Sequence, residues 1–393
     1  MSEARVNNLS NESNTGGPSI SGITTFSGAN YFVPPVGDTA QRPENPQKGA
    51  LRFNTDTKHL EYFRGDTIGW SEIEAESTEP LGGGTGSNAG RGHRGVWGGS
   101  ALAPSTGTYT NALQYITIST LGNAEDFGDM PSTVSGAATF SDRTRGVIGS
   151  GYNAGTPMMG YITFASKGNS IAFGNDLIQQ SGAWGLSNST RGLKMGGGPY
   201  LNTIAYNTIQ TLGNAVDFGD LTLNRSYAGG GASSTRGITA GGASPDGDTN
   251  VNVMDYVTIA TTGNATDFGD MLDINGTLSP SGGSNSTRLI TWGGSNAPGY
   301  ANVNTMNYLT IATTGNMLDF GDLKQKTSSG APCPDATRLV QCCASGDSAA
   351  SNTSNIIDYV QFSTTGNSLD FGDATWQAYN FHQGTMTTGH GGL

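Results

Sequence analysis

The stretch Tyr115-Ile-Thr-Ile-Ser-Thr-Leu-Gly-Asn-Ala-Glu-Asp-Phe-Gly-Asp129 decides the fold, because it occurs six times. The later copies run from Tyr161 to Asp176, Tyr206 to Asp220, Tyr256 to Asp270, Tyr308 to Asp322 and Tyr359 to Asp373. Their central residues are Phe127, Phe173, Phe218, Phe268, Phe320 and Phe371, with steps of 46, 45, 50, 52 and 51 residues. A period of this size indicates a repeat architecture, in which loops of variable length join a common unit.

Two further elements accompany the repeated stretch. An arginine followed by apolar residues, and usually by Gly-Gly, precedes each copy, at Arg94, Arg145, Arg191, Arg236, Arg288 and Arg338. A run of Gly, Ser and Ala follows most copies, as in 135–140 and 226–232. Each unit thus offers four short strands separated by Gly and Asn turns, which is typical of a β-propeller blade. We expect the small-residue strand to be innermost, and Tyr and Phe to fill the space between blades.

The two ends of the repeat region predict how the ring closes. The first unit begins near Arg94 and has only three of the four strands. After Asp373 the chain still carries Ala378 to Thr385, which is placed like the small strand of a seventh unit but could instead join the first blade. We predict an all-β, six-bladed propeller over residues 93–393, closed by a C-terminal strand. The order of the strands resembles kelch repeats, with Phe in place of the Trp of the last strand.

Composition excludes several classes of function. Lys+Arg 19 against Asp+Glu 31 gives 19 − 31 = −12, and no Lys/Arg cluster is present, so nucleic acid is not an expected partner. No apolar run approaches the length of a membrane helix, and Met1 to Ile20 lacks the apolar core of a secretory signal. Cys333, Cys342 and Cys343 match no zinc spacing and are expected to be packing residues.

The first eighty residues differ from the repeats. Residues 1–30 are predicted to be an extended arm, residues 31–76 a small β attachment segment, and residues 77–92 a Gly-rich linker. Within the attachment segment, Leu51–Phe53 and Leu60–Phe63 are predicted strands, and Trp70 ends a third. So small a sheet needs a partner surface or self-association, for which a trimer is one arrangement.

The attachment segment resembles a motif of tail-fibre and baseplate-associated virion proteins of tailed phages. The resemblance rests on the Pro-Glu-Asn-Pro lead at 43–46, Leu51-Arg-Phe-Asn-Thr-Asp-Thr57 and Gly69-Trp70. The Tyr-to-Asp repeat is similar to repeats in structural proteins of marine cyanobacterial phages. The resemblance implies a virion component that is made in the host cytoplasm, attaches to other virion proteins through residues 1–76, and displays its propeller on the tail or another particle surface.

The sequence offers no catalytic, cofactor-binding or metal-binding residues that we can assign. Asp-Phe-Gly also occurs in protein kinases, but here it lies in a repeat with no nucleotide loop and is expected to form a turn. The six repeated arginines are expected to pair with the repeated aspartates, or alternatively to form a ring that binds an anion. A glycosidase would need a carboxylate pair that breaks the repeat, and the acids mostly follow it.

Loops of irregular length are therefore the expected site of function. They contain the candidate receptor contacts Tyr152, Asn153, Tyr200, Asp246, Asp248 and Tyr300. The Gly-Gly strands lead into these loops, so they should share one face. Three alternatives remain for the function of these loops: host recognition through glycans or protein, a purely architectural decoration of capsid or tail, and a glycan depolymerase. We do not expect the protein to be an enzyme.

Overall fold

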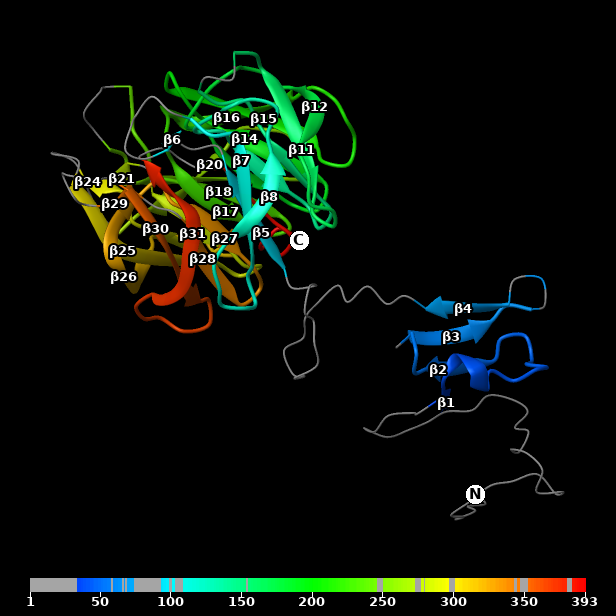
Figure 1. Ribbon diagram of the computed structural model, residues 1–393. Helices are drawn as coiled ribbons and strands as arrows, with labels where there is room; N and C mark the ends of the chain where they lie inside the picture. The colour runs from blue at the N-terminus through cyan, green and yellow to red at the C-terminus, as the bar shows by residue number, and fades with distance from the viewer. Residues whose placement is uncertain are drawn as a thin grey trace, which may run out of the picture. The chain divides into compact units, whose positions relative to one another are not determined.

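A computed structural model gives the fold of two compact units, Met1–Gly84 and Thr85–Leu393, each described by itself (Figure 1). It describes residues 34–57, 59–65, 67, 69–73, 93–98, 101–102, 109–152, 155–245, 250–272, 277–278, 280–296, 301–342, 345–346, 353–379 and 384–393. The described elements are β-strands, apart from one short 3-10 helix. The predicted all-β class is therefore confirmed, whereas the predicted arm at 1–30 and linker at 77–92 lie outside the described residues.

The first unit contains one small sheet with the strand order β1-β2-β3-β4. Its elements are β1 (Val36–Gly37), the 3-10 helix η1 (Thr39–Gln41), β2 (Leu51–Asn54), β3 (His59–Phe63) and β4 (Trp70–Ile73). β1 runs parallel to β2, and the other pairs are antiparallel. The two strands predicted around 51–53 and 60–63 are thereby confirmed, and Trp70 begins the third instead of ending it.

The described residues of the second unit form six antiparallel sheets, and all six share a four-stranded pattern. Sheet 1 contains β32 (Gly384–Thr387), β5 (Arg94–Gly98), β7 (Ala112–Thr117) and β8 (Glu125–Asp129); sheet 2 contains β9 (Thr139–Ser141), β10 (Arg145–Ile148), β11 (Met158–Thr163) and β12 (Ile171–Asn175); sheet 3 contains β13 (Trp184–Ser187), β14 (Arg191–Met195), β15 (Leu201–Thr208) and β16 (Val216–Arg225). Sheet 4 contains β17 (Gly229–Ala232), β18 (Arg236–Ala240), β19 (Val253–Thr258) and β20 (Thr266–Asp270); sheet 5 contains β22 (Ser281–Ser284), β23 (Arg288–Trp292), β25 (Ala301–Thr310) and β26 (Leu318–Ser328); sheet 6 contains β27 (Ala331–Pro334), β28 (Arg338–Cys342), β30 (Thr353–Gln361) and β31 (Leu369–Tyr379). The short strands β6 (Ala101–Leu102), β21 (Thr277–Leu278), β24 (Ser295–Asn296) and β29 (Ser345–Gly346) extend sheets 5 and 6. This arrangement is consistent with a β-propeller-like fold.

The small-residue strands lie side by side. β9, β13, β17, β22, β27 and β32 contact one another in that order, and β32 contacts β9. A Cβ atom added to Gly185 on β13 would lie 2.1 Å from the carbonyl oxygen of Thr139 on β9, so only glycine fits there. Hydroxyl groups join the same strands, as where Ser187 Oγ donates to the carbonyl oxygen of Ser141 at 2.7 Å. These strands approach one another too closely for larger side chains, which is the steric reason for which small residues were expected there.

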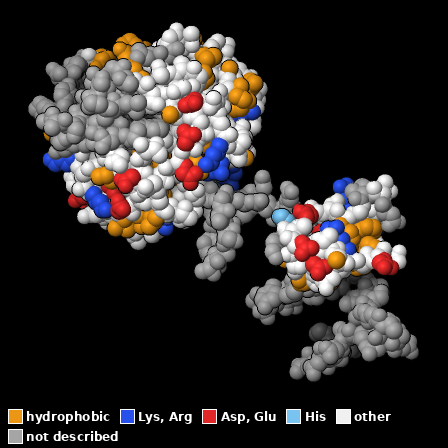
Figure 2. Space-filling model, viewed as in Figure 1, with side chains coloured by type: hydrophobic (Ala, Val, Ile, Leu, Met, Phe, Trp, Pro, Cys, Tyr) orange, Lys and Arg blue, Asp and Glu red, His pale blue; other side chains and the backbone are white. Residues whose placement is uncertain are grey.

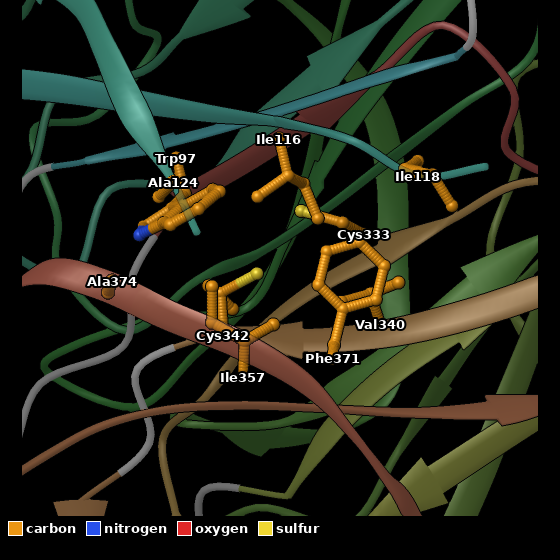
Figure 3. Packing of buried hydrophobic residues seen from close by; sticks show 11 residues of the cluster. Trp97, Ile116, Ile118, Ala124, Cys333, Val340, Cys342, Ile357, Phe371 and Ala374 are labelled. Carbon is orange, nitrogen blue, oxygen red and sulfur yellow. The ribbon is translucent and has the colours of Figure 1, made fainter. Parts of the chain in front are cut away.

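Apolar side chains fill the space between consecutive sheets. Six buried clusters exist, and each combines residues of one sheet with residues of the next. Figure 3 shows the cluster between sheet 6 and sheet 1, in which Trp97 and Ile116 meet Cys333, Cys342 and Phe371. Within every repeat the Tyr and Phe rings meet edge to face, with centroids 5.8–6.2 Å apart. Cys333 and Cys342 are buried packing residues, as predicted, and Cys343 lies outside the described residues.

The Asp-Phe-Gly-Asp motif belongs to the predicted fourth strand of the unit, and the prediction of a turn at this motif is wrong. It lies within the fourth strand of the sheets, and the phenylalanine is the extra residue of a β-bulge. In sheet 1, Leu113 pairs with Gly128 and Gln114 pairs with Asp126, so Phe127 has no cross-strand partner and points into the cluster beside it. The bulge turns a large ring inward while the strand continues.

The C-terminal strand completes sheet 1 slightly later in the chain than predicted. β32 pairs antiparallel with β5, with Met386 opposite Val96. Ala378 and Tyr379 instead belong to the end of β31 in sheet 6, where they pair with β6. The predicted strand at 378–385 is therefore divided between two sheets.

Candidate recognition surface

Each sheet of the second unit has two ends, and the long connections share one of them. At this end, here called the loop end, the second strand leads into residues 149–157 in sheet 2, 196–200 in sheet 3, and 241–252 in sheet 4. The opposite turn end carries short turns. The alternation of antiparallel strands places each of these connections at the corresponding end of its own sheet, and that the loops of all the sheets form one face stays a prediction.

The structure describes two of the six candidate receptor contacts. Tyr152 lies at the loop end of sheet 2, with 53% of its side chain exposed. Tyr200 is half-buried and has a left-handed backbone, with φ of 60°. Asn153, Asp246, Asp248 and Tyr300 lie outside the described residues. Tyr152 is thus the one exposed aromatic residue among the described candidates.

Tyr152 is held in place by its backbone and by a second tyrosine. Its main chain forms a bridge with Ser135, in which each residue donates to the other at 2.8 and 3.2 Å. Its ring lies 6.1 Å from that of Tyr109, with the planes inclined by 56°. Two tyrosines from neighbouring sheets therefore present a fixed aromatic pair, which is suited to contact the apolar face of a sugar ring.

Further exposed apolar residues lie at the loop end of sheet 2. Met158 begins β11, and Leu177 and Ile178 follow β12, each at least two-fifths exposed. Figure 2 shows hydrophobic side chains gathered on the part of the second unit that β11 and β12 occupy in Figure 1. We call Tyr109, Tyr152, Met158, Leu177 and Ile178 the sheet 2 patch. A cavity of about 20 Å³ beside Met158 is lined also by Met130, Pro131 and Ser132, and it is too small for more than a side group.

A buried ion pair supports the connection that carries the patch. Lys194 Nζ on β14 lies 2.9 Å from Asp176 Oδ2, and both side chains are almost fully buried. Ser150 donates both its amide and its hydroxyl to the same carboxylate oxygen. Burial lowers the pKa of Lys194, which the charge and hydrogen bond of Asp176 oppose. The pair joins sheets 2 and 3 through Asp176, which directly precedes Leu177 in the chain.

A second cavity, of about 60 Å³, lies between the inner strands. Hydroxyl groups and glycines line it, and most of these hydroxyls already donate to neighbouring carbonyl oxygens. The C-terminal residues cover its turn end, because Gly391 donates to the carbonyl oxygen of Ser284, and His390 Nε2 lies 2.8 Å from that of Ser141. Burial lowers the pKa of His390 to about 4. No sequence pattern indicates a role for this histidine, since it stands in no motif.

The repeated arginines do not form the predicted ion pairs with the repeated aspartates. Each guanidinium lies over the tyrosine ring of its own sheet, 4.4–5.3 Å from the centroid. Each also donates to main-chain oxygens of the next sheet, as Arg191 does to Ile259 and Ala260 at 3.2 and 2.8 Å. The equivalent acceptors belong to Phe164 for Arg94, Ile209 for Arg145, Ile311 and Ala312 for Arg236, Phe362 for Arg288, and Ile118 and Ser119 for Arg338. Among the described residues no ion pair includes these arginines, and the anion-binding alternative stays a prediction.

The sheet that carries the patch is also the one whose outer strand departs from the repeated sequence. This departure could have indicated the patch, but sequence analysis did not use it. Five of the repeats place an exposed aspartate before the phenylalanine, at Asp126, Asp217, Asp267, Asp319 and Asp370. The second repeat has Ala172 at this position, with exposed Ile171 before it and Asn175 in place of the final aspartate. The outer strand of sheet 2 is thus uncharged where the others are acidic.

Comparison with models of known protein families and with curated proteins finds no match to this chain. Among the described side chains, His, Cys, Asp and Glu nowhere form a group of three that could hold a metal ion. The described elements also include no helix that is long and apolar enough to cross a membrane.

Proposed function

We propose that the six sheets are the blades of one closed, kelch-like propeller over residues 93–393. The links between sheets 6 and 1 support this, because they are of the same kind as those between every other neighbouring pair. Arg338 donates to Ile118, as Arg191 does to Ile259, and Gly122 donates to the carbonyl oxygen of Phe371. A closed ring leaves no sheet face uncovered.

We further propose that the protein is a non-enzymatic phage virion component. Residues 1–76 attach it to other virion proteins, and the propeller is displayed on the tail, in a fibre or at the baseplate, to bind host-surface glycans. The sheet 2 patch carries this proposal, since it combines a fixed tyrosine pair with exposed apolar side chains at the loop end. Exposed apolar groups on a rigid scaffold are typical of binding surfaces.

The test of the virion role is electron microscopy of intact particles with gold-labelled antibody against residues 94–393. Label at the tail tip or fibres supports host recognition. Label over the head contradicts the receptor role and favours an architectural decoration, for which the exposed Ile171 and Val216 on the outer strands and Leu212 in the turn before β16 would supply contacts. Absence of label on particles, with the protein confined to infected lysate, contradicts the virion role.

The test of glycan recognition compares two purified variants on host cells and on isolated surface glycans. Tyr152→Ala removes the exposed ring of the patch, and we expect at least tenfold weaker binding, an order of magnitude typical for an aromatic hot spot. Leu121→Ala truncates an equally exposed side chain at the turn end of sheet 1 and should bind like the natural chain. Equal binding by both variants contradicts a role for the patch, and binding to cells stripped of glycans would assign the contact to a protein.

A further inference from the structure

The cavity beside Met158 lies between sheets 1 and 2 and extends from the surface into the protein. Pro131 and Met158 at its rim are exposed, whereas its walls include Val134 and Ile148, which are at most 6% exposed. Its volume of about 20 Å³ exceeds the roughly 10–15 Å³ that one water-sized group needs. It therefore has room for the end of a small substituent and not for a sugar ring.

The cavity reflects a glycine that stands where four of the other five sheets have a larger polar side chain. Gly160 directly precedes the repeated tyrosine of β11. The residue at this position is Gln114 in sheet 1, Ala205 in sheet 3, Asp255 in sheet 4, Asn307 in sheet 5 and Asp358 in sheet 6. Gly160 lines the cavity, and a Cβ atom added to it would lie 3.2 Å from Ser170 Oγ. The missing side chain therefore leaves space directly in front of this hydroxyl group.

Sheet 6 shows how the equivalent hydroxyl group is satisfied when the larger side chain is present. Ser368 and Ser170 both directly precede the outer strand of their sheet. Ser368 Oγ donates to Asp358 Oδ2 at 3.3 Å and accepts from the main-chain amide of Lys324 at 3.0 Å. One acceptor and one donor therefore satisfy this hydroxyl group in sheet 6.

Ser170 lacks both of these partners. Gly160 stands in place of Asp358 and offers no side-chain acceptor. Pro131 stands in place of Lys324 and has no amide proton. Among the described residues, Ser170 Oγ is accordingly buried without a hydrogen-bond partner. Because a buried hydroxyl group without a partner costs free energy, this site favours a ligand that brings one.

The chemistry of the cavity selects the substituent. Its walls are mostly apolar, and none of the described residues that line it carries a charge. A carboxylate, sulfate or phosphate would lose its hydration here without gaining a countercharge. A methyl group alone would leave the hydroxyl group of Ser170 unpaired. An acetyl group supplies both a methyl group for the walls and a carbonyl oxygen that accepts from Ser170 Oγ.

We infer that this cavity is a specificity pocket for the acetyl group of an acetylated sugar. The inference rests on the proposed recognition of glycans and deepens it, because it names the substituent that is recognised. Val134 lines the pocket and directly precedes Ser135, whose main chain pairs with that of Tyr152. The connection that holds the exposed tyrosine in place therefore also forms a wall of the pocket.

The direct test is saturation-transfer NMR of the full chain with three monosaccharides. N-acetylglucosamine should receive its strongest saturation at the methyl protons of the acetyl group. Glucose should bind at least about tenfold more weakly, which is the discrimination typical of a methyl-sized group in a fitted pocket. O-acetylglucose carries the same group on an ester, and a preference for it over N-acetylglucosamine would assign the pocket to O-acetylated glycans.

Variants of the pocket test whether the cavity causes the preference. Gly160→Asn fills the cavity and gives Ser170 an acceptor, so it should abolish the preference for acetylated sugars while the chain stays folded. Gly213→Asn is the control, since an added Cβ atom meets nothing within 4 Å there, and it should keep the preference. If Gly160→Asn fails to fold, Ser170→Ala removes only the hydroxyl group and should weaken binding of the acetylated sugar by roughly three- to tenfold.

The outcomes separate this inference from the proposed function. Equal binding of the three monosaccharides, or none, overturns the inference and assigns the cavity to ordered water. A preference that survives both Gly160→Asn and Ser170→Ala also overturns it. Binding of host glycans that depends on Tyr152 but not on their acetyl groups overturns the inference and leaves the proposed function intact. Absence of binding to host glycans, with a preference for acetylated monosaccharides that Gly160→Asn removes, contradicts the proposed function and supports the pocket.

Discussion

The main-chain amide of Asp373 donates to Oδ1 of Asn123 at 3.0 Å, although the two residues are 250 positions apart in the chain. The same contact joins the other neighbouring sheets at 3.0–3.1 Å, between Asp129 and Asn169, Asn175 and Asn214, Asp220 and Asn264, Asp270 and Asn316, and Asp322 and Asn367. The glycine before each asparagine donates to the carbonyl oxygen of the repeated phenylalanine of the preceding sheet. The Gly-Asn pair of the repeat is therefore the element that fastens each outer strand to the next sheet.

The close approach at this contact predicts unequal effects of two similar substitutions. A Cβ atom added to Gly174 would lie 2.1 Å from the carbonyl oxygen of Gly213, whereas one added to Gly213 meets nothing within 4 Å. We expect Gly174→Ala to destabilise the protein by about 2–3 kcal/mol, since backbone must move, and Gly213→Ala to cost below about 1 kcal/mol. Thermal or urea unfolding of both variants measures this. Equal losses would show that the two sheets are not in contact here.

Removal of the last ten residues tests the closed ring. A chain that ends at Gln383 lacks β32, so β5 loses its inner partner and the neighbouring clusters lose Met386, which is 1% exposed. We expect loss of the cooperative unfolding transition of the second unit, or a fall in its stability of at least about 3 kcal/mol. Differential scanning calorimetry measures it, with removal of residues 1–33 as the control. An unchanged transition would contradict closure by the C-terminal strand.

The stability should fall in weak acid because of His390. Gly392 donates its amide to Nδ1 at 3.2 Å, so protonation at Nδ1 would set two donors against each other. Burial lowers the pKa of His390 from 6.5 to about 4. Between these two pH values the folded state therefore binds fewer protons than the unfolded state. The free energy of unfolding consequently declines as the pH falls through this window. The decline is at most about 1.4 kcal/mol per pH unit.

A difference measurement isolates this effect from other titrating groups. The unfolding free energies of the natural chain and of His390→Asn are compared at intervals from pH 7 to pH 4. The natural chain should lose its advantage over the variant progressively below pH 6.5. A difference that stays constant with pH would mean that the ring remains accessible to protons in the folded state.

Much of the fold could be predicted from the sequence because the period is visible along the chain. Four short strands, small residues such as Gly185 on the inner strand, and buried Phe127 all follow from local composition and sterics. A period does not reveal whether a repeated residue contacts its own unit or the next. For this reason the sequence predicts an ion pair for Arg191, whereas in the structure Arg191 donates to the backbone of the following sheet. The position of β32 could not be predicted because Gly384–Thr387 carries no repeat signature.

The candidate surface was predicted only in part. Tyr152 could be predicted because it is an aromatic residue in an irregular loop that follows the second strand of its unit. Leu177 and Ile178 were missed, since two adjacent apolar residues after a strand are equally typical of a buried core. Their exposure depends on Asp176 pointing inward to Lys194, a contact between sheets that no local pattern shows.

The last prediction concerns this buried pair. Lys194→Met removes the cation and leaves the buried Asp176 carboxylate with its hydrogen bonds from Ser150 but without the countercharge, so we expect a loss of about 3–5 kcal/mol. Lys167→Met removes the cation of the exposed pair with Glu125, where both side chains are about half exposed or more, and should change the stability far less, because solvent screens an exposed pair. Urea unfolding of the two variants gives both values. Because Asp176 anchors the connection that carries Leu177, Lys194→Met should also weaken glycan binding under conditions where the chain remains folded. Similar losses for the two lysines would contradict a buried, desolvated charge at position 194, and with it the support that holds the sheet 2 patch in place.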